Sequence, residues 1–124
     1  MAGQKQNLMD LFADVNRFFS PKIVGEVNDV FIKIVKVKGQ DVPWHTHDNE
    51  DEMFYVIKGR LNMEFKGIDN IQLNAGDFFI VDKGIEHRAY SEKECWLLLI
   101  ENKSTRHTGN VQSPITKTIN EQYY

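Results

Sequence analysis

The sequence contains a single cysteine, Cys95, among its 124 residues. One thiol cannot form a disulfide within the chain, so a disulfide-stapled fold is excluded and a reducing compartment is favoured. Long apolar runs are also missing, because the longest strong one, residues 96–100, is far shorter than the roughly 18 residues of a membrane span. The first residues lack the charged-then-apolar layout of a secretory signal. These absences predict a cytoplasmic protein with no membrane partner.

An excess of positive charge is absent as well. The chain has 15 Lys and Arg residues against 18 Asp and Glu residues, for a formal net charge of −3. Nucleic-acid-binding domains usually carry a basic face, so we expect no nucleic-acid partner. With 41% hydrophobic and 27% charged residues, the composition is that of a folded domain. The length suits one domain, residues 1–124, and is too short for two.

Local patterns divide the chain into a short helical part and a long β part. Apolar residues recur at helical spacing over residues 8–19, which predicts one amphipathic helix, and Ser20-Pro21 ends it. From there to residue 102, short β-branched and aromatic segments alternate with turn residues. The expected strands cover residues 22–27, 30–38, 42–47, 53–58, 61–65, 71–73, 78–81, 87–90 and 96–101. This pattern predicts an all-β sandwich or barrel with its core at about residues 22–102.

The last segment, residues 103–124, is polar and weakly patterned, which predicts a loosely ordered tail. A less favoured alternative places a strand over residues 115–119 against a second subunit. His107 lies in this segment, and we expect it at the surface. Cys95 precedes an apolar strand, and we expect a small buried side chain there rather than a catalytic thiol.

Two of the four histidines accompany a glutamate in a pattern that suits a metal ion. His45 and His47 are two residues apart in an expected strand, so their side chains would share one face, about 7 Å apart. Glu52 follows a polar loop that is long enough to return the chain on a neighbouring strand. The alternative for this segment is a pair of surface histidines beside a solvated run of acids.

Two motifs in this region resemble those of the cupin superfamily. Residues 39–59 fit the first cupin motif, G-x5-H-x-H-x4-E-x6-G, at every specified position. Residues 76–91 resemble the second motif, G-x5-P-x-G-x2-H-x3-N, with Asp82 in place of the proline and Ser91 in place of the asparagine. The resemblance implies the cupin double-stranded β-helix, a jelly-roll barrel, here with a short N-terminal helix. It also implies one divalent metal ion: Fe, Mn, Ni, Co or Zn. The implied metal ligands are His45, His47, Glu52 and His87.

Alternation along the strands indicates which side chains would share the inner face with these ligands. The expected cavity wall is mostly apolar, and its candidate residues are Pro43, Phe54, Val56, Ala89 and Ser91. For Phe54 and Val56, plain core packing is the favoured alternative. A sugar phosphate would require cations at the cavity mouth, and the nearest are Lys58, Arg60 and Lys83.

The resemblance implies a metal-dependent protein that binds a small oxygenated organic substrate, and it leaves the reaction open. One candidate activity is oxygen insertion, as in quercetin and acireductone dioxygenases. Another is isomerisation of a sugar or keto acid, as in phosphomannose isomerases. The alternative is a non-enzymatic module that binds a sugar or carboxylate, so whether the protein is an enzyme stays open. Cupins commonly pair, and the apolar helix face together with the strand at residues 22–27 favours a homodimer.

Overall fold

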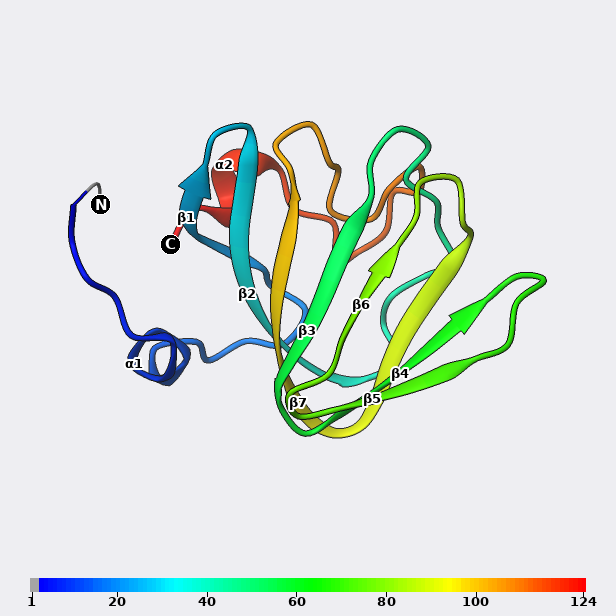
Figure 1. Ribbon diagram of the computed structural model, residues 1–124, viewed down its shortest axis with the longest axis horizontal. Coiled ribbons are helices and arrows are strands. Elements are labelled where there is room, and N and C mark those ends of the chain that lie inside the picture. Colours follow the sequence, from blue (N-terminus) through cyan, green and yellow to red (C-terminus); the bar gives the residue numbers. More distant parts are fainter. Residues whose placement is uncertain (1–2) are drawn as a thin grey trace.

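The structure is a computed structural model that describes residues 3–124 (Figure 1). Its elements are α1 (Leu8–Ala13), β1 (Lys22–Val27), β2 (Val30–Gly39), β3 (Glu52–Lys58), β4 (Arg60–Phe65), β5 (Ile71–Asn74), β6 (Phe78–Val81), β7 (His87–Asn102) and α2 (Ile119–Gln122). The predicted all-β architecture with a short N-terminal helix is thereby confirmed. Among residues 3–124, no helix has both the length and the apolar character that a membrane crossing requires.

All pairs among the seven strands are antiparallel. The longest strand, β7, pairs with β2, β3 and β4. The main path of hydrogen-bonded neighbours runs β1-β2-β7-β3-β6. The second half of β7 lies between β2 and β3, whereas its first half pairs with β4, which in turn pairs with β5. Because β7 belongs to both parts, it curves the sheet into a barrel, with the β4–β5 hairpin on the right in Figure 1.

The pattern predicts two strands where the structure has the single strand β7, and this prediction was wrong. Polar residues 91–94 interrupt the apolar alternation, so the sequence pattern predicts a break between two strands there. The backbone continues because Ser91 pairs with Gly39, and its hydroxyl donates to the carbonyl oxygen of Arg60 at 2.8 Å. The other expected strands are confirmed to within one residue at each end, except for residues 42–47, which form no strand.

Helix α1 ends at Ala13 rather than at Phe19, which corrects the predicted helix over residues 8–19. Beyond Ala13 the chain turns toward β2, where the Phe19 N–H donates to the carbonyl oxygen of Lys36 at 2.8 Å. Phe12 and Val15 are still buried as the spacing predicts, because they pack on the outside of the chain's own barrel. The apolar face is therefore partly covered within one chain, with Phe18 still 43% exposed, and the homodimer stays a prediction.

Apolar side chains from both parts of the sheet fill the barrel interior. The buried core residues there are Phe19, Val35, Val37, Phe54, Val56, Leu61, Met63, Phe65, Leu73, Val81, Ala89, Cys95, Leu97 and Leu99. Each large apolar side chain buried in this way contributes about 1.5–3 kcal/mol relative to an exposed one.

The segment after β7 is ordered against the barrel, which corrects the expected loose tail. In Figure 1 it runs behind the sheet and ends in α2 beside β1. Gln122 of α2 is 0% exposed, and Tyr123 forms a β-bridge with Ile23 of β1. Residues 115–119 form no strand, and Ile115 packs against the barrel core. Polar anchors rather than apolar periodicity hold this segment, so the pattern does not reveal its order.

Candidate metal centre

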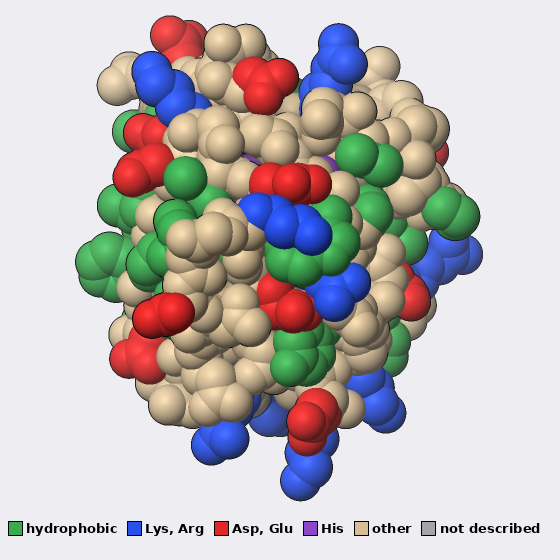
Figure 2. Space-filling view, turned by 90° about the vertical axis from the view of Figure 1, so that its right-hand side faces the viewer, with side chains coloured by type: hydrophobic (Ala, Val, Ile, Leu, Met, Phe, Trp, Pro, Cys, Tyr) green, Lys and Arg blue, Asp and Glu red, His purple; other side chains and the backbone are tan. Residues whose placement is uncertain are grey.

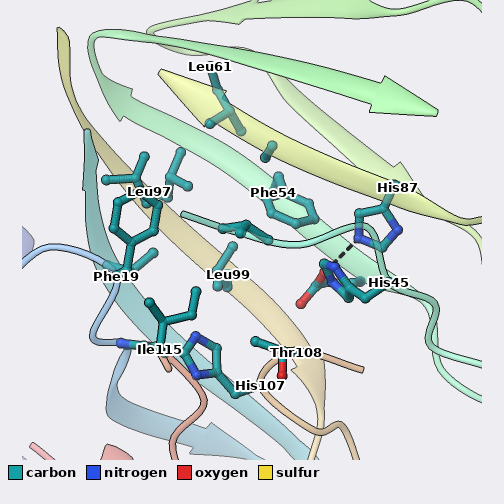
Figure 3. Close-up of a pocket in the computed structure, with 16 residues that line it drawn as sticks. Phe19, His45, Phe54, Leu61, His87, Leu97, Leu99, His107, Thr108 and Ile115 are labelled. Atoms are coloured by element: carbon teal, nitrogen blue, oxygen red, sulfur yellow. Dashed lines mark ion pairs between the residues drawn. The ribbon is translucent and has the colours of Figure 1, made fainter. Parts of the chain in front are cut away.

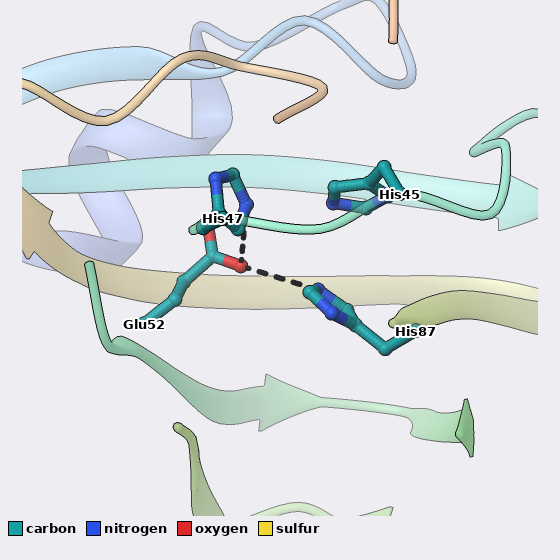
Figure 4. A group of neighbouring side chains, drawn as sticks. All are labelled: His45, His47, Glu52 and His87. Carbon is teal, nitrogen blue, oxygen red and sulfur yellow. Dashed lines mark ion pairs between the residues drawn. The ribbon is translucent and has the colours of Figure 1, made fainter. Parts of the chain in front are cut away.

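Four potential metal ligands converge inside the barrel (Figure 4): His45, His47, Glu52 and His87. The first two lie in the loop that leads to β3, the glutamate opens β3, and the last histidine opens β7. One nitrogen or carboxylate oxygen of each lies within 4.8 Å of those of the others. All four residues are buried, and only small parts of histidine side chains are visible on the face shown in Figure 2. The residues that the motifs select are therefore together in space.

The loop that carries His45 and His47 is not the strand that the pattern predicts. Within residues 42–47 the sheet contact is a single bridge, in which His45 and His87 each donate their N–H to the other's carbonyl oxygen at 3.0 Å. Pro43 lacks an N–H, so a regular ladder cannot form across this segment. The two backbone bonds nevertheless hold residues from distant parts of the sequence side by side.

Backbone carbonyl groups orient two of the imidazole rings. Nδ1 of His45 lies 2.8 Å from the carbonyl oxygen of Pro43, and Nδ1 of His87 lies 2.9 Å from that of Ile85. A carbonyl oxygen only accepts, so each Nδ1 carries the hydrogen and each Nε2 keeps a free lone pair. Metal-binding histidines generally make this second contact. Pro43 thus lies behind His45, and it does not border the cavity described below.

Several polar atoms of the cluster have no hydrogen-bond partner within residues 3–124: both ring nitrogens of His47, Oε1 of Glu52 and Nε2 of His87. Oε1 of Glu52 is 3.5 Å from Nε2 of His47 and 3.7 Å from Nε2 of His87. Leaving such a buried atom unpaired costs about 1–3 kcal/mol. Three imidazole nitrogens and a carboxylate oxygen form a donor set that suits Fe, Mn, Ni, Co or Zn. The residues therefore fit the ion that the resemblance implies.

Burial and neighbouring charges shift the pKa values in the cluster. Burial, together with His87, lowers the pKa of His45 to about 4, so this imidazole is neutral at pH 7. Burial raises the pKa of Glu52, but the nearby Glu101 carboxyl and the rings of His47 and His87 outweigh it and hold that pKa well below its ordinary value. Burial also lowers the pKa of His47, yet the Glu52 carboxylate more than offsets this effect. A neutral imidazole and an ionised carboxylate are the forms that bind metals.

A second layer of buried polar side chains lies behind Glu52. Glu101 of β7 stands opposite Glu52 of β3 and forms an ion pair with Lys33 of β2. Lys33 is 1% exposed and also donates a hydrogen bond to the side-chain oxygen of Gln122. Burial, together with the charge of Glu52, raises the pKa of Glu101 well above its ordinary value. A chain of polar contacts thereby joins helix α2 to the carboxylate of the cluster.

A cavity of about 60 Å³ adjoins the cluster (Figure 3). His45, Glu52 and His87 form its polar end. The remaining wall is mostly apolar and includes Phe19, Val37, Phe54, Leu97, Leu99 and Ile115. In the described part of the chain, no lysine or arginine borders this cavity.

The structure places the predicted wall residues at different depths. Phe54 and Ala89 border the cavity, whereas Val56 and Ser91 do not. Val56 is 0% exposed within the packed core. It lies four residues beyond Glu52, which is about 13 Å along a strand. Strand alternation therefore gives the inward face correctly but does not tell how far along the strand the cavity extends.

His107, which we expect at the surface, borders the cavity instead, and that prediction was wrong. Its Nδ1 accepts a hydrogen bond from the Lys117 N–H at 2.9 Å. Burial, with a further contribution from the charge of Lys33, lowers the pKa of His107 to about 4. No motif or periodicity surrounds this residue in the sequence. The only available signal was the presence of a fourth histidine.

The segment that carries His107 is pressed against the loop of His45. The Thr46 N–H donates to the side-chain oxygen of Asn110 at 3.0 Å, and the Asn110 N–H donates to the Thr46 carbonyl at 3.1 Å. Gly109 has φ +58, and a Cβ there would lie 2.9 Å from Cδ2 of His45 and still closer to the Thr46 carbonyl oxygen. Glycine alone combines this backbone conformation with so close an approach.

The barrel and the buried histidine–glutamate cluster together define a cupin, and the chain belongs to the cupin family. The family model described as "Cupin domain" matches residues 32–101. The uncharacterized protein YdbB of Bacillus subtilis (strain 168) is 32% identical over 98 residues, which are 79% of this chain and 86% of that protein.

Two solved structures illustrate the similarity. A cupin-2 domain containing protein from Shewanella frigidimarina is 38% identical, with a TM-score of 0.75 over 78% of this chain and 93% of that one. Hydroquinone 1,2-dioxygenase from Sphingomonas sp. TTNP3, solved with 4-hydroxybenzoate bound, is 21% identical, with a TM-score of 0.74 over 82% of this chain and 32% of that one. The second likeness concerns the fold alone.

Proposed function

We propose that the protein binds one divalent metal ion through His45, His47, Glu52 and His87 and acts on a small oxygenated organic compound in a dioxygenase-type reaction. The observation that carries this proposal is the convergence of buried, unpartnered donor atoms at the polar end of an apolar cavity. A bound ion of this kind supplies Lewis acidity and, as Fe or Mn, redox chemistry with oxygen.

The residues of the chain hold the reacting groups in place and keep water away. The carbonyl groups of Pro43 and Ile85 keep Nε2 of His45 and of His87 directed at the centre. The apolar wall takes the carbon part of the substrate and excludes bulk water from the reacting end. The small volume of the cavity favours a short-chain compound. Hydroxyketones, diketones and enediols have that size and carry the required oxygens.

Two features favour this chemistry over isomerisation of a sugar phosphate. A phosphate group would need cations, and Lys58, Arg60 and Lys83 do not border the cavity. An isomerase also needs a group that takes up and returns a proton. Apart from the cluster itself, His107 is the one titratable side chain that borders the cavity in residues 3–124. Its pKa of about 4 makes it a weak base at neutral pH.

Oxygen consumption tests the proposal. Protein purified without a nickel column is loaded anaerobically with Fe(II) or Mn(II) and mixed with short-chain hydroxyketones, diketones and enediols, and separately with a sugar phosphate. We expect oxygen uptake with a member of the first group and none with the sugar phosphate. His47→Ala, which removes a proposed ligand, serves as the negative control. Isomerisation of the sugar phosphate without oxygen uptake would refute the proposal.

Non-enzymatic binding of a small oxygenated compound is the second candidate function. The scarcity of acid–base groups around the cavity is the observation that favours it. Under this alternative, the metal-loaded protein binds members of the same panel but converts none of them with any of the five candidate metals. Enzymatic conversion of any one compound in the panel would refute this alternative.

A further inference from the structure

His107 borders the cavity but lies outside the residues that the family model matches. The family model matches residues 32–101, and His107 follows that region in the C-terminal segment. Together with Thr108 and Ile115 it borders the same cavity as His45, Glu52 and His87. In Figure 3 these three residues lie on the side of the cavity away from Leu61 and Phe54. A side chain at this place can contact a ligand that also reaches the metal centre.

The ring of His107 is held in one tautomer by the backbone. The Lys117 N–H donates to Nδ1 at 2.9 Å, so Nδ1 carries no hydrogen. In the neutral ring the hydrogen must then be on Nε2, which becomes a donor. Within residues 3–124, Nε2 has no hydrogen-bond partner, although the cavity lies beside it. An oriented donor without a partner at the wall of an apolar cavity is suited to a polar group of a ligand.

The segment that carries His107 is anchored on both sides of the histidine. After it, Asn110 exchanges two hydrogen bonds with Thr46, and Gly109 packs closely against His45. Before it, Thr105 is buried with 1% exposure. The position of the donor relative to the metal centre is therefore set by the same contacts that hold the His45 loop. A preorganised donor loses little entropy when a ligand binds.

We propose that the Nε2–H of His107 recognises a second oxygen of the substrate, while a first oxygen of the same molecule reaches the metal centre. This inference rests on the proposed function and deepens it. It assigns the substrate to short-chain compounds with two oxygen functions, one for the metal centre and one for His107. The proposed selecting residue lies outside residues 32–101, which the family model matches.

Two conservative variants separate this role from a structural one. His107→Gln keeps an amide N–H near the position of Nε2 and loses the acceptor for the Lys117 N–H. His107→Asn keeps an acceptor near the position of Nδ1 and loses the donor that reaches the cavity. If His107 recognises a ligand, His107→Asn should weaken ligand binding more than His107→Gln does. If His107 only anchors its segment, His107→Gln should weaken ligand binding more than His107→Asn does.

The probes are glycolohydroxamate and propionohydroxamate, added to the Co(II)-loaded protein and followed through the visible absorption of the cobalt. They share the metal-binding group and the size, and they differ in a terminal hydroxyl against a methyl group. We expect the wild-type protein to prefer the hydroxyl compound by about three- to tenfold, the value of one hydrogen bond. The preference should vanish in His107→Asn and persist in part in His107→Gln. Cobalt affinity and thermal unfolding of each variant serve as controls.

The outcomes separate the two levels of the proposal. An unchanged preference in His107→Asn, or equal weakening of both probes in His107→Gln alone, overturns the role of His107 and leaves the metal centre untouched. Failure of the wild-type protein to bind cobalt or either probe overturns the proposed function and this inference with it.

Discussion

Replacing Gly109 with alanine puts a methyl group where the structure has no room for one. The new carbon would lie 2.9 Å from Cδ2 of His45. Nonbonded carbons settle at about 3.5–4.0 Å, so one side must move by roughly 0.6 Å or more. The segment on one side of this contact carries His107, and the loop on the other carries His45, a proposed metal ligand. We therefore expect the substitution to displace His45 and disturb the metal centre, although it changes none of the four proposed ligands.

Gly67→Ala is the matched control for this substitution. Gly67 has φ +77, and a Cβ added there would meet nothing within 4 Å, so it shares the backbone conformation of Gly109 without the contact. Alanine in this left-handed conformation costs about 1–2 kcal/mol in both variants. Overpacking adds about 1–3 kcal/mol in Gly109→Ala alone. Displacing groups that orient metal ligands typically weakens metal binding about 10- to 100-fold, and we expect a loss of that order only in Gly109→Ala.

Two measurements check this prediction. Urea unfolding of the metal-free proteins gives the difference in the free energy of unfolding between each variant and the wild type. Competition with a chromophoric chelator gives the affinity for Mn(II) or Zn(II). Equal metal affinities in Gly109→Ala and Gly67→Ala would refute the reasoning, because the strain would then be absorbed by the C-terminal segment and not by the His45 loop.

Three further predictions concern single residues. His47→Ala and His87→Ala should each lose bound metal and stay folded, because neither residue belongs to the apolar core; elemental analysis and circular dichroism check this, and full metal occupancy in both would contradict the ligand set. Burial raises the pKa of the Cys95 thiol to about 12, so a disulfide reagent should leave it unmodified until the protein is unfolded in urea, and rapid reaction of the native protein would contradict that burial. The pKa of His107 is about 4 in the folded protein against 6.5 ordinarily, so the unfolded state takes up its proton first as the pH falls. Its contribution to the stability of the metal-free protein, at most about 3 kcal/mol, should be lost between these two pH values, and urea titrations of His107→Gln should show a shallower pH dependence.

The strands and the proposed ligands could be predicted because short-range patterns encode them. Alternating β-branched residues and turn residues locate most strand ends to within one residue. The motif spacing selects the four residues that the barrel brings within 4.8 Å of one another. The same rules do not register that residues 42–47 leave the sheet, because the irregular path through Pro43 depends on the bridge between His45 and His87.

The C-terminal segment could not be predicted because its anchors join residues far apart in the sequence. Gln122 meets Lys33 across 89 positions, and Asn110 meets Thr46 across 64. Each contact satisfies one polar group and leaves no periodic trace in the sequence around it. The role of His107 is hidden for the same reason, since its neighbours along the chain say nothing about the cavity beside it.

The Lys33–Gln122 contact has a consequence for how such a protein can diversify. A chain shortened to residues 32–101 would retain every proposed ligand and the ion pair of Lys33 with Glu101, yet Lys33 would lose the side-chain oxygen of Gln122 that accepts its hydrogen bond. If His107 recognises the substrate as proposed, substitutions in the C-terminal segment would alter the choice of substrate and leave the four proposed metal ligands in place.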